Sequence, residues 1–176
     1  MSTHHTRLGA VARGIAAGVV GTGFMTLAQT LPAKLQSSAA GPQDEQSDEQ
    51  QQGEQDPWEQ ASAPAKVAKR ISEGVFDHDV PAERIPLLTH AMHWGYGTGW
   101  GAVYGIVRGS ARPVGPLRHG LLFGTAVWAM SYVQLVPMGI YELPWKYAPK
   151  EIAMEVGYHL AYGIGVASTF RMLDGR

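Results

Sequence analysis

Four long runs without a charged residue constrain the fold of this 176-residue chain more than any other feature. With histidine counted as neutral, they cover residues 14–33, 85–107, 120–141 and 152–170, the last containing one acid, Glu155. Each run approaches the roughly 20 residues that a helix needs to cross about 30 Å of hydrocarbon. A soluble helix normally carries a polar stripe, which the first run lacks. We therefore expect an all-α membrane protein, a bundle of four transmembrane helices, with a soluble helical bundle as the alternative.

The acidic residues are concentrated in one segment of the chain. Eleven of the 15 acids lie within residues 32–86, and residues 36–65 are rich in Gln, Glu, Ser and Pro. Such a composition cannot bury enough apolar surface to offset its ordering entropy. We expect residues 34–84 to form a largely disordered extracytoplasmic loop. Within it, residues 65–76 fit either an amphipathic helix on the membrane surface or a polar connector.

The short segments between the runs set the expected topology, because basic residues favour the cytoplasmic side of a membrane. Arginines lie before the first run, in the short loop at 108–117 and at the C-terminus. The expected segments are a cytoplasmic N-terminus at 1–12, helices at 13–33, 85–107, 118–138 and 151–171, a rigid interfacial loop rich in proline and aromatic residues at 139–150, and a cytoplasmic C-terminus at 172–176. Alternatively, the first run is a cleaved signal peptide.

The chain repeats itself. The stretch HWGYGTGWGAVYG at 93–105 resembles EVGYHLAYGIGVA at 155–167, and the first and third runs also correspond. This pattern predicts two parallel helical-hairpin repeats related by a pseudo-twofold axis along the membrane normal, unless the similarity of glycine-rich segments is accidental. His93 corresponds to Glu155 in the repeat. We expect these two side chains to pair across the axis.

Small residues recur at four-residue spacing in every run, which predicts close helix packing, since lipid supplies no hydrophobic force between helices. The candidate packing residues are Gly14, Gly18, Gly97, Gly101, Gly105, Gly120, Gly124, Gly157, Ala161 and Gly165.

Five short motifs in the second half resemble the YagU-like family of bacterial inner-membrane proteins. They are GLLFG at 120–124, PMG at 137–139, LPW at 143–145, KEI at 150–152 and GYHL at 157–160. The resemblance is good over residues 120–171, and the acidic loop has no part in it. It implies a four-span protein of the inner membrane, but no reaction.

Ionisable residues are costly in a membrane, so those within or beside the runs form a candidate polar cluster. Its members are His90, His93, Glu151, Glu155 and His159. Three interpretations remain open: a structural or partner-binding role, transport of a proton, cation or small solute, and binding of a metal or haem, for which His93, Glu155 and His159 are the candidate ligands. No cofactor motif or catalytic motif is present, so neither a cofactor nor an enzymatic activity is predicted.

Composition limits the expected partners. The 14 basic and 15 acidic residues nearly balance, which argues against binding of nucleic acid. The expected partners are the lipid bilayer and either a second copy of the chain or another membrane protein. The chain has no cysteine, which excludes disulfides and thiolate sites.

Overall fold

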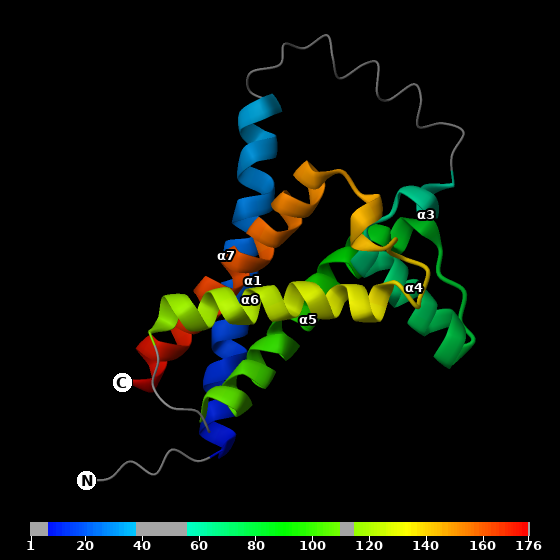
Figure 1. Cartoon of the computed structure of the whole chain (residues 1–176). Coiled ribbons are helices and arrows are strands. Elements are labelled where there is room, and N and C mark those ends of the chain that lie inside the picture. Colours follow the sequence, from blue (N-terminus) through cyan, green and yellow to red (C-terminus); the bar gives the residue numbers. More distant parts are fainter. Residues whose placement is uncertain (1–6, 38–55, 110–114, 176) are drawn as a thin grey trace. The chain divides into compact units, whose positions relative to one another are not determined.

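A computed structural model describes residues 7–37, 56–109 and 115–175, and over these ranges the chain forms helices and no strand. The all-helical expectation is therefore confirmed. Within these ranges six α-helices follow one another (Figure 1): α1 (Arg7–Ser37), α3 (Pro57–Gln60), α4 (Ala63–Phe76), α5 (Ile85–Gly109), α6 (Pro116–Leu135) and α7 (Pro149–Asp174). Two short 3₁₀ helices, η2 (Ala82–Arg84) and η3 (Pro144–Lys146), lie between them.

The chain divides into two compact units, and their boundaries fall within α1 and α5. One unit consists of Met1–Ala28 and His93–Arg176, and the other of Gln29–Met92. We call them the glycine unit and the acidic unit. The acidic unit thus has helical contacts of its own.

Proline and glycine residues mark the ends of several helices in the glycine unit. Pro116 and Pro149 each occupy a first helical position, where a missing N–H is harmless. Helices α6 and α7 therefore start two residues earlier than the predicted 118 and 151. Helix α6 stops at Leu135, before the predicted 138, in a turn whose Gly139 has a positive φ of 65°.

The interior of the glycine unit is built from small and aromatic side chains. Ala17, Thr22, Tyr162 and Val166 are almost fully buried. Aromatic rings pack edge to face around them, including Tyr104 against Phe123 and Phe170, with ring centroids 4.8 and 5.4 Å apart. Large apolar side chains instead are exposed, among them Leu8, Phe24, Leu27, Ile106, Val107, Leu117, Leu122 and Val133.

One helix of the described residues is long and apolar enough to cross a membrane, over Leu8–Leu31. A signal sequence or a buried core helix satisfies the same criterion, so this helix alone does not establish a membrane protein. Helices α5, α6 and α7 contain many glycine, histidine, tyrosine and tryptophan residues, whose hydropathy is low. The predicted number of four spans therefore remains an expectation.

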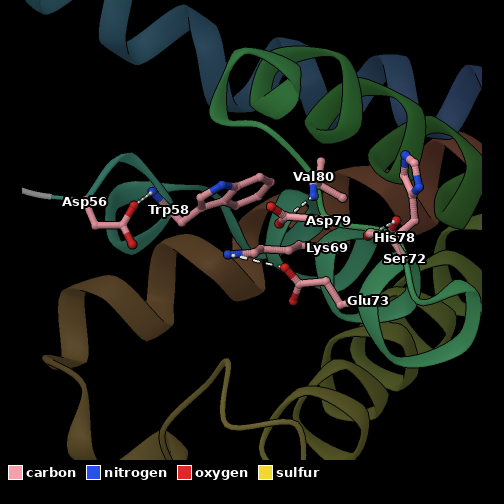
Figure 2. A network of polar contacts seen from close by, with 8 residues as sticks. All are labelled: Asp56, Trp58, Lys69, Ser72, Glu73, His78, Asp79 and Val80. Carbon is pink, nitrogen blue, oxygen red and sulfur yellow. Dashed lines mark hydrogen bonds and ion pairs between the residues drawn. The ribbon is translucent and has the colours of Figure 1, made fainter.

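The acidic unit contains helices where the sequence led us to expect disorder. Residues 38–55 of the predicted loop lie outside the described residues, but residues 56–84 form α3, α4 and η2. Helix α3 begins after Asp56, whose carboxylate accepts the Trp58 N–H at 3.0 Å (Figure 2). Lys69 of α4 lies over the Trp58 ring, 4.7 Å from its centroid, and pairs with Glu73 at 3.6 Å. These contacts between side chains of α3 and α4 stabilise the two short helices, and the amino-acid composition of the segment does not predict them.

Helix α4 starts two residues before the predicted 65–76 segment and is amphipathic. Ala65 and Ala68 are buried on one face, whereas Val75 and Phe76 are each 72% exposed. The helix ends at Asp77, which adopts the left-handed conformation with a φ of 50°. Beyond it the Ser72 hydroxyl donates to the His78 carbonyl at 2.9 Å (Figure 2).

Candidate functional site

Helices α1 and α5 approach each other at glycines, so closely that a Cβ would not fit. A Cβ built on Gly101 would lie 2.5 Å from the Gly14 carbonyl oxygen and 2.7 Å from the Gly18 nitrogen. On the other side, a Cβ on Gly18 would lie 2.9 Å from the Gly97 carbonyl oxygen and 3.0 Å from the Thr98 Cα. The atoms that such a Cβ would meet belong to the backbone of the other helix, which cannot move aside as a side chain can. The glycines therefore fix how near the two helices lie.

Helices α6 and α7 meet through the corresponding residues. A Cβ on Gly163 would lie 2.6 Å from the Gly124 nitrogen and 2.8 Å from its Cα, and would also meet the Gly120 carbonyl. A Cβ on Gly124 would lie 3.0 Å from the Leu160 Cα and would meet the His159 carbonyl. In the repeat, Gly14 and Gly18 correspond to Gly120 and Gly124. Gly97, Thr98 and Gly101 correspond to His159, Leu160 and Gly163. The two helix pairs thus make the same backbone contacts at equivalent positions.

Further along each pair, a hydroxyl meets an ionisable side chain, again at equivalent positions. In α1 and α5, Thr26 Oγ1 lies 3.2 Å from His93 Nε2. In α6 and α7, the Tyr132 hydroxyl donates to Glu155 Oε2 at 2.7 Å. Thr26 already donates its proton to the Thr22 carbonyl at 2.9 Å, so His93 Nε2 is the donor to Thr26. We call these two interactions the hydroxyl pairs.

No ion pair joins His93 to Glu155 in the described residues, so their predicted pairing stays a prediction. Glu155 takes its hydrogen bond from Tyr132 and forms no ion pair with any basic side chain of the described residues. Each residue is held within its own helix pair. The repeat placed the two residues at equivalent positions, but equivalence alone does not bring two side chains together.

Other members of the candidate polar cluster have separate environments. His90 is exposed on α5. Glu151 accepts the Ala148 N–H at 3.1 Å and thereby caps the start of α7. His159 Nδ1 donates to the Glu155 backbone carbonyl one turn earlier, at 2.8 Å. No group of three or more His, Asp or Glu side chains in the described ranges could hold a metal, so His93, Glu155 and His159 do not form a metal site there.

Glu155 belongs instead to a cluster of tyrosines, which we call the tyrosine cluster: Tyr132, Tyr141, Tyr147 and Glu155. The ring centroid of Tyr132 lies 5.3 Å from that of Tyr141 and 6.4 Å from that of Tyr147. The centroids of Tyr141 and Tyr147 are 6.3 Å apart. Burial, and next the charge of the neighbouring Glu155, raise the pKa of Tyr141 above its ordinary value. The phenol therefore stays neutral beside the carboxylate.

The segment between α6 and α7 is held in place by its own contacts. The Glu142 N–H donates to the Tyr147 hydroxyl at 2.9 Å, and the Lys146 ammonium pairs with the Glu142 carboxylate at 2.7 Å. These contacts place the Tyr147 ring beside Tyr141. The sequence suggested a rigid interfacial loop from its prolines and aromatic residues, but not that Tyr141 lies near Glu155 or that Tyr147 packs on Tyr132 and Tyr141.

The packing glycines include two that four-residue spacing did not identify. Gly163 faces α6, as described above, and a Cβ on Gly21 would lie 2.9 Å from the Tyr162 carbonyl oxygen. Gly157 was predicted to pack, but it is exposed and a Cβ there would meet nothing within 4 Å. Ala161 is half-buried. The repeat could have identified Gly163 as a packing residue, since Trp100-Gly101 corresponds to Tyr162-Gly163 and Gly101 was already a candidate.

A comparison with family models finds no match to this chain, and neither curated proteins nor solved structures give one. The resemblance to the YagU-like family therefore stays an expectation from the motifs.

Proposed function

We propose that this chain is an integral protein of the bacterial inner membrane, with α1, α5, α6 and α7 as four transmembrane helices. The arrangement of side chains in the glycine unit carries this proposal. Glycine and alanine lie where helices meet, whereas large aliphatic side chains such as Leu122 and Val133, 63% and 65% exposed, point outward. Water would penalise so many exposed aliphatic groups, but lipid solvates them.

The equivalent contacts of the two helix pairs support an internal repeat. Corresponding residues make corresponding backbone approaches and corresponding hydroxyl pairs, which accidental similarity of glycine-rich segments does not require. We infer two parallel hairpins, α1 with α5 and α6 with α7, and both termini in the cytoplasm.

We propose a structural or partner-binding role for the bundle, in which the hydroxyl pairs hold each hairpin together. In a bilayer a polar side chain needs a protein partner, and Thr26 and Tyr132 supply one for His93 and Glu155. Transport of a small solute, cation or proton is the second candidate. It is favoured by one observation: Glu155 is half-buried and no described basic side chain pairs with it.

Labelling of single cysteines tests the membrane topology, because the chain has no native cysteine. Glu83 and Gly115 are both exposed. In intact spheroplasts, a cysteine at Glu83→Cys should react with an impermeant maleimide, whereas one at Gly115→Cys should react only after lysis. Equal labelling of both before lysis, or extraction of the protein by alkaline carbonate, would contradict the proposal.

A further inference from the structure

One end of the glycine unit is rich in arginine and poor in acidic residues. Residues 93–135 contain three arginines and no acidic residue. Asp174, the acidic residue at the end of α7, forms an ion pair with Arg13 at 3.2 Å. The Arg13 guanidinium lies over the Phe170 ring, and that ring packs on Tyr104 of α5. These contacts bring parts of α1, α5 and α7 together at this end of the unit.

Two further arginines act on one side chain at the start of α6. Arg108 at the end of α5 and Arg118 of α6 both lie close enough to His119 for their charges to act on it. Arg108 also lies beside the Tyr104 hydroxyl. His119 Nε2 is buried and has no hydrogen-bond partner in the described residues. A histidine carries no negative charge in either form, so this corner of the bundle concentrates positive charge and favours an anion.

An anion can reach this corner without any movement of the packed helices. Arg118 is exposed, Arg108 is half-buried, and no ion pair of the described residues includes Arg118. A guanidinium has five N–H donors and binds phosphate through two parallel hydrogen bonds. Arg108 therefore has donors for a phosphate oxygen in addition to its contact with Tyr104.

Exposed apolar side chains lie beside both arginines. Leu121 and Leu122 follow Arg118 by three and four residues, on the same face of α6, and are 38% and 63% exposed. Val107, next to Arg108, is 62% exposed. A soluble phosphate would leave these side chains uncovered, whereas the acyl chains of a phospholipid would pack on them. The combination favours a lipid as the source of the phosphate.

We propose that Arg108 and Arg118 bind the phosphate of an anionic phospholipid, whose acyl chains lie against Leu121 and Leu122. An anionic headgroup is selected because a zwitterionic one carries its own ammonium group, which the two arginines repel. The inference rests on the proposed membrane location and specifies which lipid the cytoplasmic end binds. A protein that proves soluble overturns both, whereas a membrane protein without the lipid preference overturns this inference alone.

Native mass spectrometry of the full chain in neutral detergent is the test, with an equimolar mixture of phosphatidylglycerol and phosphatidylcholine as the probe. We expect phosphatidylglycerol to stay bound preferentially, one molecule per chain. Arg118→Gln should lower its retention about fivefold, which is the factor that one basic residue contributes at an anionic lipid surface. Arg118→Lys keeps the charge but loses the paired hydrogen bonds, so it should restore part of the retention.

Lys150→Gln is the matched control, because it removes one exposed basic side chain from the other end of α7. It should leave the retention of phosphatidylglycerol unchanged. Inorganic phosphate is added to test the soluble source of the anion. Displacement of the lipid by an equal concentration of phosphate would show that the acyl chains contribute nothing, and would overturn the assignment to a lipid. Equal retention of the two lipids, or equal losses in Lys150→Gln and Arg118→Gln, would overturn the proposal as a whole.

Discussion

Tyr141 illustrates how one side chain links the connecting segment to α7. Its ring packs on Tyr132 and Tyr147, and its hydroxyl lies near enough to Glu155 for the carboxylate charge to oppose ionisation. Burial opposes ionisation as well, and more strongly. A residue in this position keeps its proton in the folded state at a pH where the unfolded chain has lost it.

The stability of the protein should therefore fall at alkaline pH in a way that depends on Tyr141. Its pKa is raised on folding. The stabilisation is thus complete below the ordinary tyrosine pKa of about 10 and is lost as pH rises above it. Thermal unfolding measured from pH 8 to 12 should show a shallower alkaline decline for Tyr141→Phe than for the native chain. If the melting temperatures of the two proteins fell equally with pH, Tyr141 would not be the source of the alkaline loss of stability.

At the scale of helices, the position of each glycine on its helix decides whether the helix can pack. Gly157 and Gly163 lie on the same helix, yet a Cβ at Gly163 would meet the backbone of α6 and a Cβ at Gly157 would meet nothing within 4 Å. The face of α7 that carries Gly163 is therefore the one that fixes the distance to α6. Gly101 has the same position on α5, against α1.

We predict that Gly163→Ala and Gly101→Ala destabilise the protein by at least about 1–3 kcal/mol, because the obstructing atoms are backbone and the helices must separate. The control Gly157→Ala should be neutral or should stabilise the protein by up to about 1 kcal/mol, through helix propensity. Thermal unfolding in detergent measures all three variants. Similar effects at Gly157 and Gly163 would show that the helix contacts are not as described.

At the scale of the whole molecule, the exposed aliphatic side chains are the basis of the proposed membrane location, and they allow it to be tested against a soluble bundle. Leu122 is 63% exposed in the second turn of α6. On the surface of a soluble protein, Leu122→Lys would change stability by only about 0.5 kcal/mol. Within a bilayer, a lysine costs about 2.5–3.5 kcal/mol at the centre of a helix and less toward its ends, which still exceeds the cost at a soluble surface.

Leu122→Lys should accordingly lower membrane insertion and the stability of the inserted protein, as measured by the fraction resistant to carbonate extraction. Glu83→Lys, at an exposed position in the acidic unit, is the control and should have no effect. Normal yield and stability of Leu122→Lys in a soluble fraction would favour the soluble bundle.

The sequence alone determined the long helices of the glycine unit and much of their contact pattern. Long apolar runs can satisfy backbone hydrogen bonds only as helices in an apolar environment, and small residues at four-residue spacing mark one face of each helix. The positions of Gly14, Gly18, Gly101, Gly120 and Gly124 in helix contacts follow from these local rules. The start of α7 also has local causes, in Pro149 and the Glu151 cap.

Only the tertiary structure decided which side chains meet. His93 and Glu155 are equivalent in sequence, but in the structure His93 contacts Thr26 and Glu155 contacts Tyr132, each on the other helix of its own pair. The same holds for Tyr141, which the connecting segment brings near a carboxylate on the next helix, and for Tyr147, which packs on Tyr132. Helix formation depends on neighbours within a few residues, whereas a site depends on the crossing geometry of separate helices, which no local pattern records.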